Sequence, residues 1–600
     1  MDMQKNREEI DSRYQWRLED LFETDELWLQ TAQAAEEKIE EIRKYSGKFT
    51  KNAASMAECI GKLYELNGIV TKLYVYAYMR RDEDSTKPFY QDLAGKADML
   101  ATKFSAAVSF FEPELLTLNK EKISKYIKKE PALGEYAFTI EEIMRKKAHV
   151  LSKAEERLLA MSAEATSAGQ DVFMMFNNAD IKFPVITDEN GKKVELTNGR
   201  YLKFMESPDR NTRKRAFKAL YDTYGAYRNT LAAAYAGSVK SDKFYAEAQK
   251  YSSCLSAALY QDNVPSTVYN GLIQTVHANI KKLTPYLELR KKMLGVRKLH
   301  MYDLYVPFVK TPQKTYSFEE AREIVLEALK PLGEEYGSVL KTAFTDGWID
   351  VQENRGKRTG AYSWGCYGCH PFVLLNWQGT INDVFTLAHE LGHAMHTYYS
   401  NTAQPLQYAE YKIFVAEVAS TVNENLLMEY LLAHTKDDTE KAFLLNHYLE
   451  EFRATVFRQT MFAEFEKTAH KMYERGESLT CEALSSVYYR LQKKYFKKVM
   501  KIDKEIALEW ARIPHFYTAF YVYKYATGFS AATILASGIL SADQEKLEKY
   551  LAFLKGGSSD YPMELLRKAG VDLSSPEPVQ AALELFEQKT KQLEALTGSV

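Results

Sequence analysis

The chain of 600 residues contains few cysteines and no long apolar run. Five cysteines in so long a chain exclude a disulfide framework and are typical of a reducing cytoplasm. No run of roughly 18 apolar residues is present, so we expect no segment to span a membrane. Residues 1–14 are polar and charged, and they lack the apolar core of a secretory signal. We therefore predict a cytoplasmic location.

The chain also lacks an excess of charge of either sign, with 79 basic and 81 acidic residues and a net charge of −2. This balance argues against a nucleic-acid-binding protein and against a polybasic membrane-binding one, so we expect neither partner. The hydrophobic content of 46% is ample for a large core, and 600 residues exceed one ordinary domain. We expect a monomer or a weak homo-oligomer.

Helical patterns fill most of the sequence. Residues 28–42 place apolar side chains at steps of three and four, which is typical of an amphipathic helix. Ser152 with Glu155, and Ser317 with Glu320, have the spacing of capping boxes at the start of further helices. The sequence therefore predicts a mostly α fold.

Two short segments depart from this pattern. Residues 181–197 place apolar side chains on both sides of Asn190-Gly191, which predicts a β-hairpin. Residues 371–377, PFVLLNW, predict a strand in a small sheet beside the helix that follows. We expect an N-terminal helical domain over residues 1–200, ending in the hairpin, and a catalytic domain over residues 201–600.

The segment HELGH begins at His389, inside a predicted helix. Thr380 and Asp383 have the spacing of a capping box, and apolar residues then recur at helical steps. His389 and His393 are one turn apart, so both imidazoles project from one side and can bind one zinc ion. Glu390 lies roughly 100° around the helix, where it can hold a water molecule beside the metal and act as general base.

A zinc hydrolase needs a third protein ligand and an open fourth position. The carboxylates downstream are those of Glu410, Glu417 and Glu424, and the last two share one face of a second predicted helix. Packing of the two helices would bring Glu417 to the histidines, although a solvated carboxylate has the same pattern. The metzincin arrangement is excluded, because it needs Gly at 396 and His at 399, where this chain has His396 and Tyr399.

Longer segments around these residues resemble one family. HELGHAMH at residues 389–396 and FVAEVAST at residues 414–421 resemble the thimet oligopeptidase (M3) family of zinc peptidases. YQWRLEDLF at residues 14–22, CHPFVLLNWQGT at 369–380 and RIPHFYTAFYVYKYATG at 512–528 resemble its oligoendopeptidase F branch. The resemblance spans nearly the whole chain. It implies a multi-helix, clam-like peptidase with a deep channel and one zinc ion per chain.

The resemblance also implies roles for single residues. By position, Glu417 matches the third zinc ligand and Glu390 matches the general base. Glu424 falls where the family keeps another acid, which we expect to hold a ligand histidine from outside the metal sphere. The resemblance further implies that the oxyanion is stabilised from residues 512–528, by His515, Tyr523 and, with a poorer match, Tyr521.

We predict a zinc metalloendopeptidase that cleaves internal bonds of short, unstructured peptides. Asn376 lies on the predicted strand before the zinc helix, and an exposed edge there would pair with an extended peptide, so we assign Asn376 to substrate binding. One alternative is a metallocarboxypeptidase, in which a cation such as Arg512 would bind the terminal carboxylate. A second is a catalytically silent peptide-binding protein.

A motif with a different meaning is C-x-x-C-H at residues 366–370, the form of a c-type haem attachment site. Haem attachment of this type requires export, for which the sequence shows no signal. We therefore expect no haem.

Overall fold

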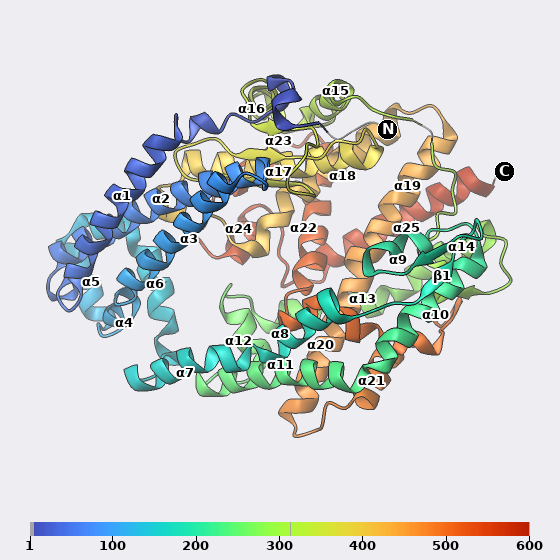
Figure 1. The fold of residues 1–600 in the computed structure, drawn as a ribbon, viewed down its shortest axis with the longest axis horizontal. Coiled ribbons are helices and arrows are strands. Elements are labelled where there is room, and N and C mark those ends of the chain that lie inside the picture. The colour runs from blue at the N-terminus through green and yellow to red at the C-terminus, as the bar shows by residue number, and fades with distance from the viewer. Residues whose placement is uncertain (1–4, 313, 599–600) are drawn as a thin grey trace. The chain divides into compact units, whose positions relative to one another are not determined.

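The chain is described by a computed structural model that covers residues 5–312 and 314–598 (Figure 1). It is mostly helical with a few short strands, which confirms the predicted fold class. The chain divides into two compact units that are each discontinuous in sequence. Unit 1 comprises residues 1–148, 314–430 and 535–571, and unit 2 comprises residues 149–313, 431–534 and 572–600. The boundary that we predicted at residue 200 therefore falls inside unit 2.

The α-helices of unit 1 come from all three of its segments. They are α1 (Asp25–Ile42), α2 (Ala53–Glu83), α3 (Pro88–Val108), α4 (Phe111–Leu115), α5 (Lys120–Lys129), α6 (Ala137–Arg145), α15 (Phe318–Ala328), α16 (Gly333–Thr345), α17 (Ile381–Ala403), α23 (Gln544–Leu554) and α24 (Pro562–Lys568). Two helices run from one unit into the other, namely α18 (Ile413–His434) and α22 (Tyr523–Leu540).

The α-helices of unit 2 are α7 (Lys153–Thr166), α8 (Ala168–Met175), α9 (Asn198–Met205), α10 (Arg210–Ala226), α11 (Arg228–Ala248), α12 (Cys254–Tyr260), α13 (Ser266–Asn279), α14 (Leu283–Met293), α19 (Asp438–Phe452), α20 (Gln459–Glu474), α21 (Cys481–Phe496) and α25 (Glu577–Gly598). The predicted capping boxes begin α7 in unit 2 and α15 in unit 1. No helix of the described residues is long and apolar enough to cross a membrane.

The predicted hairpin is confirmed in unit 2. Strand β1 (Val185–Thr187) pairs antiparallel with β2 (Lys193–Glu195). The turn contains Asn190 and Gly191, and Gly191 adopts a φ of 78°, a left-handed conformation that glycine reaches at little cost. The Asp188 carboxylate accepts hydrogen bonds from the backbone N–H groups of Asn190 and Lys192, which closes the turn.

Unit 1 contains a three-stranded sheet beside α17, in the order β4 (Ile349–Asp350), β6 (Phe372–Leu374), β5 (Tyr362–Trp364). Strand β6 pairs in parallel with β4 and antiparallel with β5. The predicted strand over residues 371–377 is therefore real but shorter, and it is the central strand. Its interior position contradicts our expectation that the strand of Asn376 offers an edge to a peptide, since both of its edges are already paired.

Asn376 itself lies beyond the end of β6. Its Nδ2 donates hydrogen bonds to the carbonyl oxygens of Arg358 and Gly360, at 2.9 and 2.7 Å. The side chain thus holds the loop that leads into β5. In the described residues β5 pairs only with β6, so β5 is the strand of this sheet that offers an edge next to α17.

Buried charges attach the N-terminal segment to this sheet. The guanidinium of Arg7 contacts Asp350 of β4 at 2.6 Å and Glu83 of α2 at 2.9 Å. The ammonium of Lys357 contacts Asp350 at 2.6 Å, and the indole Nε1–H of Trp16 donates to Glu83 at 2.7 Å. Each buried carboxylate is therefore paired, as burial of charge requires.

Candidate metal centre

Helix α17 presents the two histidines of HELGH on the side opposite its apolar face. The capping box is present, because the Asp383 N–H donates to Thr380 Oγ1 and the Thr380 N–H donates to Asp383 Oδ2. The side chains that we predicted to form the apolar face are completely buried, namely Val384, Leu387, Ala388, Leu391 and Met395. Packing of that face fixes the rotation of α17 and so the direction of His389 and His393.

Helix α18 crosses α17 at Gly392. A Cβ atom at Gly392 would lie 2.5 Å from the Cα atom of Ser420 and 2.8 Å from the carbonyl oxygen of Ala419. The amide Nδ2 of Asn423 donates to the carbonyl oxygen of Ala388 at 3.1 Å and ties the two helices a turn further on. Glycine at 392 is therefore what permits the approach of the two backbones, and this approach brings Glu417 to the histidines.

We expect Gly392→Ala to destabilise the protein by about 1–3 kcal/mol or more, the usual effect of overpacking a core, because backbone atoms of α18 must move. The shift should also weaken metal binding, because it displaces Glu417. Denaturant unfolding and metal titration measure the two effects. Gly337→Ala in α16 is a matched control, since a Cβ there meets nothing within 4 Å. Unchanged stability and affinity in Gly392→Ala would contradict this account of the crossing.

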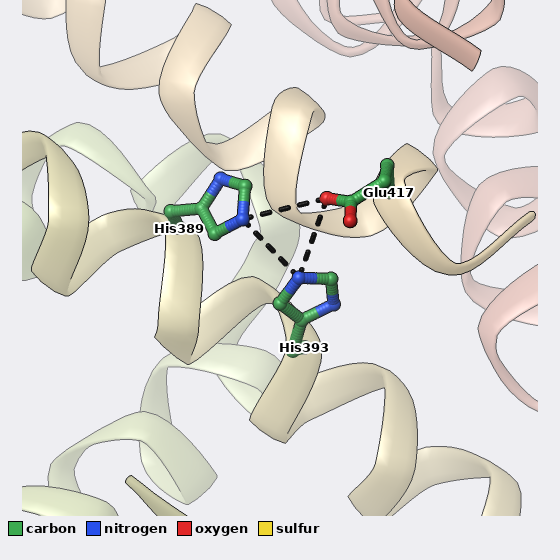
Figure 2. Close-up of side chains that lie close together, drawn as sticks. All are labelled: His389, His393 and Glu417. Carbon is green, nitrogen blue, oxygen red and sulfur yellow. Dashed lines mark hydrogen bonds and ion pairs between the residues drawn. The ribbon is translucent and has the colours of Figure 1, made fainter. Parts of the chain in front are cut away.

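Three donor atoms converge in the space between α17 and α18, as Figure 2 shows. His389 Nε2 and His393 Nε2 are 3.2 Å apart, and Glu417 Oε2 lies 3.4 Å from each. Tetrahedral ligands at zinc–ligand distances of 2.0–2.1 Å are separated by about 3.3–3.4 Å, so the spacing fits that geometry. Two imidazoles and one carboxylate are also a donor set used by catalytic zinc sites. The residues present therefore fit a zinc ion.

Two further side chains orient the cluster. Glu424 Oε1 lies 3.0 Å from His389 Nδ1, so the contact that we predicted for Glu424 is present. Donation from Nδ1–H to this carboxylate leaves the lone pair of Nε2 directed at the cluster. The hydroxyl of Ser420 donates to Glu417 Oε2 at 3.1 Å and holds that carboxylate from its own helix.

The charges of the cluster perturb its pKa values. Burial alone would lower the pKa of His389, but its hydrogen bonds to Glu417 and Glu424 raise it well above its ordinary value. Burial would raise the pKa of Glu417, but its contacts with the two histidines outweigh burial and hold the pKa well below its usual range. The cluster thus favours an ionised Glu417 facing a positive charge on His389. A bound cation would supply that positive charge in place of the proton on the histidine.

Glu390 does not belong to the cluster. Its side chain is buried at 8% exposure, and burial raises the pKa of its carboxyl group although His389 and His393 oppose the rise. The backbone N–H of Ser363, in strand β5, hydrogen-bonds to the Glu390 carboxyl group. A buried carboxyl group with a raised pKa beside a metal cluster has the properties of a general base. Ser363 was missed by the sequence reasoning, because only the folded sheet places it there.

Two other residues near the motif lie outside the cluster. His396 is buried, stacks on the ring of Tyr411 at 3.7 Å between centroids, and burial lowers its pKa to about 3. It is not among the three residues that could share one ion. Glu410 is exposed and is not among the three residues that could share one ion.

The residues predicted to stabilise the oxyanion belong to unit 2. The rings of His515 and Tyr521 are 6.5 Å apart, and both side chains are half-buried. Burial lowers the pKa of His515, and Arg458 adds to this effect, which favours the neutral ring. Tyr523 is only 1% exposed, with its ring packed on Tyr269 at 5.0 Å between centroids. On exposure, Tyr521 is therefore better suited than Tyr523 to reach a substrate.

Two further sequence features have structural roles. Tyr517 is buried, and its ring stacks on Phe173 at 4.3 Å between centroids, as a core residue would. The cysteines of the C-x-x-C-H motif are free, and its His370 contacts Asp20 at 2.9 Å and stacks on Trp348. His370 therefore serves as a packing residue that joins the loop before β6 to the N-terminal segment.

Comparison with known proteins agrees with the site. The sequence model of peptidase family M3 matches residues 203–585, and an Oligopeptidase F model matches residues 114–183. Oligopeptidase PepF of Bacillus subtilis is 47% identical, with 99% of this chain and 89% of that protein covered. An oligoendopeptidase F homolog of Lactococcus lactis is 43% identical, with 99% of each chain covered. The crystal structure of oligoendopeptidase-F from Enterococcus faecium is 40% identical with a TM-score of 0.75, and the match covers 96% of this chain and 100% of that one.

Fold, site and relatives together define the chain as a peptidase. It belongs to peptidase family M3, and within that family to the oligoendopeptidase F branch.

Proposed function

We propose that the chain is a zinc-dependent endopeptidase that hydrolyses internal bonds of short, unstructured peptides. The observation that carries the proposal is the set of three donor atoms at 3.2–3.4 Å from one another, beside the buried carboxyl group of Glu390. His389, His393 and Glu417 would hold one zinc ion per chain. When bound, zinc supplies Lewis-acid activation, which lowers the pKa of a water molecule from 15.7 to about 7.

The chain's own residues then move the proton. Glu390 accepts the proton of the attacking water on its carboxylate and passes it to the leaving amine nitrogen. Its raised pKa suits both tasks, because the carboxylate is a stronger base than an exposed one and the resulting acid is neutral in a buried site. Glu424 keeps His389 in the tautomer that directs Nε2 toward the ion.

The three-stranded sheet beside α17 offers an edge for substrate binding. We propose that an extended peptide pairs with the edge of β5, whose Ser363 also contacts Glu390. Backbone pairing gives affinity without a strict choice of sequence. From the resemblance we further propose His515 as a donor to the oxyanion, with Tyr521 ahead of Tyr523 because of its exposure. The role of Asn376 in substrate binding stays a prediction. Asn376 would act indirectly, by holding the loop that leads into β5.

The alternatives are less well supported. A carboxypeptidase would need a free cation for the terminal carboxylate, but Arg512 contacts Glu509 at 3.1 Å within unit 2. A silent peptide binder has no use for a buried general base beside a metal cluster. The five cysteines are free, which supports our proposal of a cytoplasmic location.

The test is a mass-spectrometric digest that compares end-blocked peptides of roughly 5–20 residues with stably folded proteins, a length taken from pairing along one strand edge. We expect internal cleavage of the peptides, with activity lost on chelation and restored by zinc. Folded proteins should resist, because they must first lose about 5–15 kcal/mol of stability. Stepwise loss of C-terminal residues would support a carboxypeptidase instead, and binding without cleavage would support a silent binder.

A further inference from the structure

A cavity of about 260 Å³ in unit 1 is lined in part by residues of α17 one and two turns beyond His393. Its walls come from α2, from β5 and the segment that follows it, from the C-terminal half of α17, and from the loop before α18. The lining residues on which the argument rests are Asn67, Ser363, Thr397, Asn401, Leu406 and Glu410. None of them is a metal ligand or the general base.

The cavity continues the face of α17 that carries the metal ligands. Thr397 and Asn401 follow His389 and His393 at steps of four residues, so all four side chains lie along one side of the helix. A step of four residues advances about 6 Å along the axis, and an extended peptide advances about 3.3 Å per residue. A peptide held at β5 would therefore bring a side chain two to four residues from the scissile bond to this cavity.

The cavity presents hydrogen-bond acceptors and one negative charge. Glu410 is the only charged side chain among its lining residues in the part of the chain that the structure describes, and its carboxylate makes no ion pair there. Asn401 uses its Nδ2–H to donate to the carbonyl oxygen of Cys366, which leaves its Oδ1 as an acceptor. The hydroxyl of Ser363 is buried and has no hydrogen-bond partner among these residues.

A cation that follows the α2 lining in sequence packs on an aromatic ring, and part of the wall is apolar. The ammonium of Lys72, which follows a lining residue on α2, lies over the ring of Phe22 at 5.2 Å. Leu406 packs against Gly68, and a Cβ atom at that glycine would meet the leucine side chain at 3.1 Å. Together with Trp364 and Ala409, Leu406 gives a surface against which an alkyl chain can pack.

We propose that this cavity is a subsite that binds a lysine or arginine side chain of the peptide substrate, with Glu410 as the counter-charge. The proposal rests on the proposed endopeptidase function. The alkyl stem of the basic residue would lie along Leu406 and Trp364. Its cationic head would donate hydrogen bonds to Glu410 and to the Oδ1 of Asn401.

The test measures kcat/KM on pairs of internally quenched, end-blocked peptides. The two peptides of a pair differ at one position, which is arginine in one and norleucine in the other. The pairs cover each position from four residues before to four residues after the cleaved bond. In the wild-type protein we expect arginine to be preferred at one position between two and four residues from the bond. Because exposed ion pairs contribute little, Glu410→Gln should reduce this preference by only about two- to fivefold. Glu410→Lys should reduce it by about tenfold or more and should favour a glutamate peptide.

Glu334→Lys in α16 is the matched control, because Glu334 is also an exposed glutamate of unit 1 and does not line the cavity. It should leave the arginine preference unchanged. An identical preference profile in the wild-type protein, Glu410→Lys and Glu334→Lys would overturn the subsite. Cleavage of the norleucine peptides distinguishes failure of the subsite proposal from failure of the endopeptidase proposal. If these peptides are cut but arginine is never preferred, the subsite fails, whereas absence of any cleavage means that the endopeptidase proposal fails.

Discussion

Glu390→Gln should lose most of its turnover of end-blocked peptides while it keeps its metal. General-base catalysis contributes about 10²–10⁴-fold, and an amide cannot accept the proton of the attacking water. The fold should be retained, because glutamine has the same size and its oxygen can still accept the hydrogen bond of the Ser363 N–H. Initial rates at saturating peptide, together with metal content by mass spectrometry, measure the two quantities.

A conservative control sharpens this prediction. Glu334→Gln removes a carboxylate from the same unit, and Glu334 lies outside both the cluster and the cavity, so end-blocked peptides should be cleaved at a nearly normal rate. Turnover of Glu390→Gln within a few-fold of the wild-type value would contradict the assignment of the general base. Loss of metal from this variant would show that Glu390 is needed to hold the ion instead.

Glu417→Ala should release the metal and abolish activity with it. Only His389 and His393 would remain as protein ligands, and a catalytic zinc site normally has three. The loss of affinity should exceed the roughly 10–100-fold effect of removing an outer partner, such as Glu424, because a direct ligand is removed. Competition with a chromogenic chelator measures the affinity, and circular dichroism checks that the helices remain.

The matched control for this variant is Glu410→Ala, seven residues earlier in the chain. Its carboxylate is exposed and does not reach the donor cluster, so its metal affinity should equal that of the wild-type protein. If Glu410→Ala lost the metal and Glu417→Ala kept it, the ligand set would be wrong. Reduced affinity in both variants would mean that the loop before α18 rearranges when the ion binds.

The sequence alone predicted the features that depend on neighbours in the chain. The capping box of Thr380 with Asp383 and the pairing of His389 with His393 need only the geometry of one helix, and both are present. The hairpin over residues 181–197 was predictable for the same reason, since its turn chemistry lies within a few residues. The family resemblance added Glu417 and Glu424, whose positions the residue spacing had left open.

Other expectations failed because they depended on partners distant in the sequence. The strand before Asn376 is central and not an edge, because it pairs with Ile349–Asp350 and with Tyr362–Trp364, and no local pattern predicts either pairing. Each unit is built from three separate segments of the chain, and a single boundary at residue 200 does not describe such a division. Tyr523 and Tyr521 look alike in sequence, but the tertiary packing, which includes Tyr269, buries Tyr523 and leaves Tyr521 half-buried.

The sequence by itself therefore determined the chemistry of the site. It provides two imidazoles one helical turn apart, the carboxyl group of Glu390 directly after the first of them, and a second helix downstream that carries Glu417 and Glu424. What only the tertiary structure decided is how these parts meet. The crossing of α17 and α18 at Gly392 and Ser420 sets the separation of Glu417 from the histidines, and the sheet order places Ser363 against Glu390. The physical reason is that helical spacing is fixed by local backbone geometry, whereas the distance between two helices depends on side-chain packing along their whole contact.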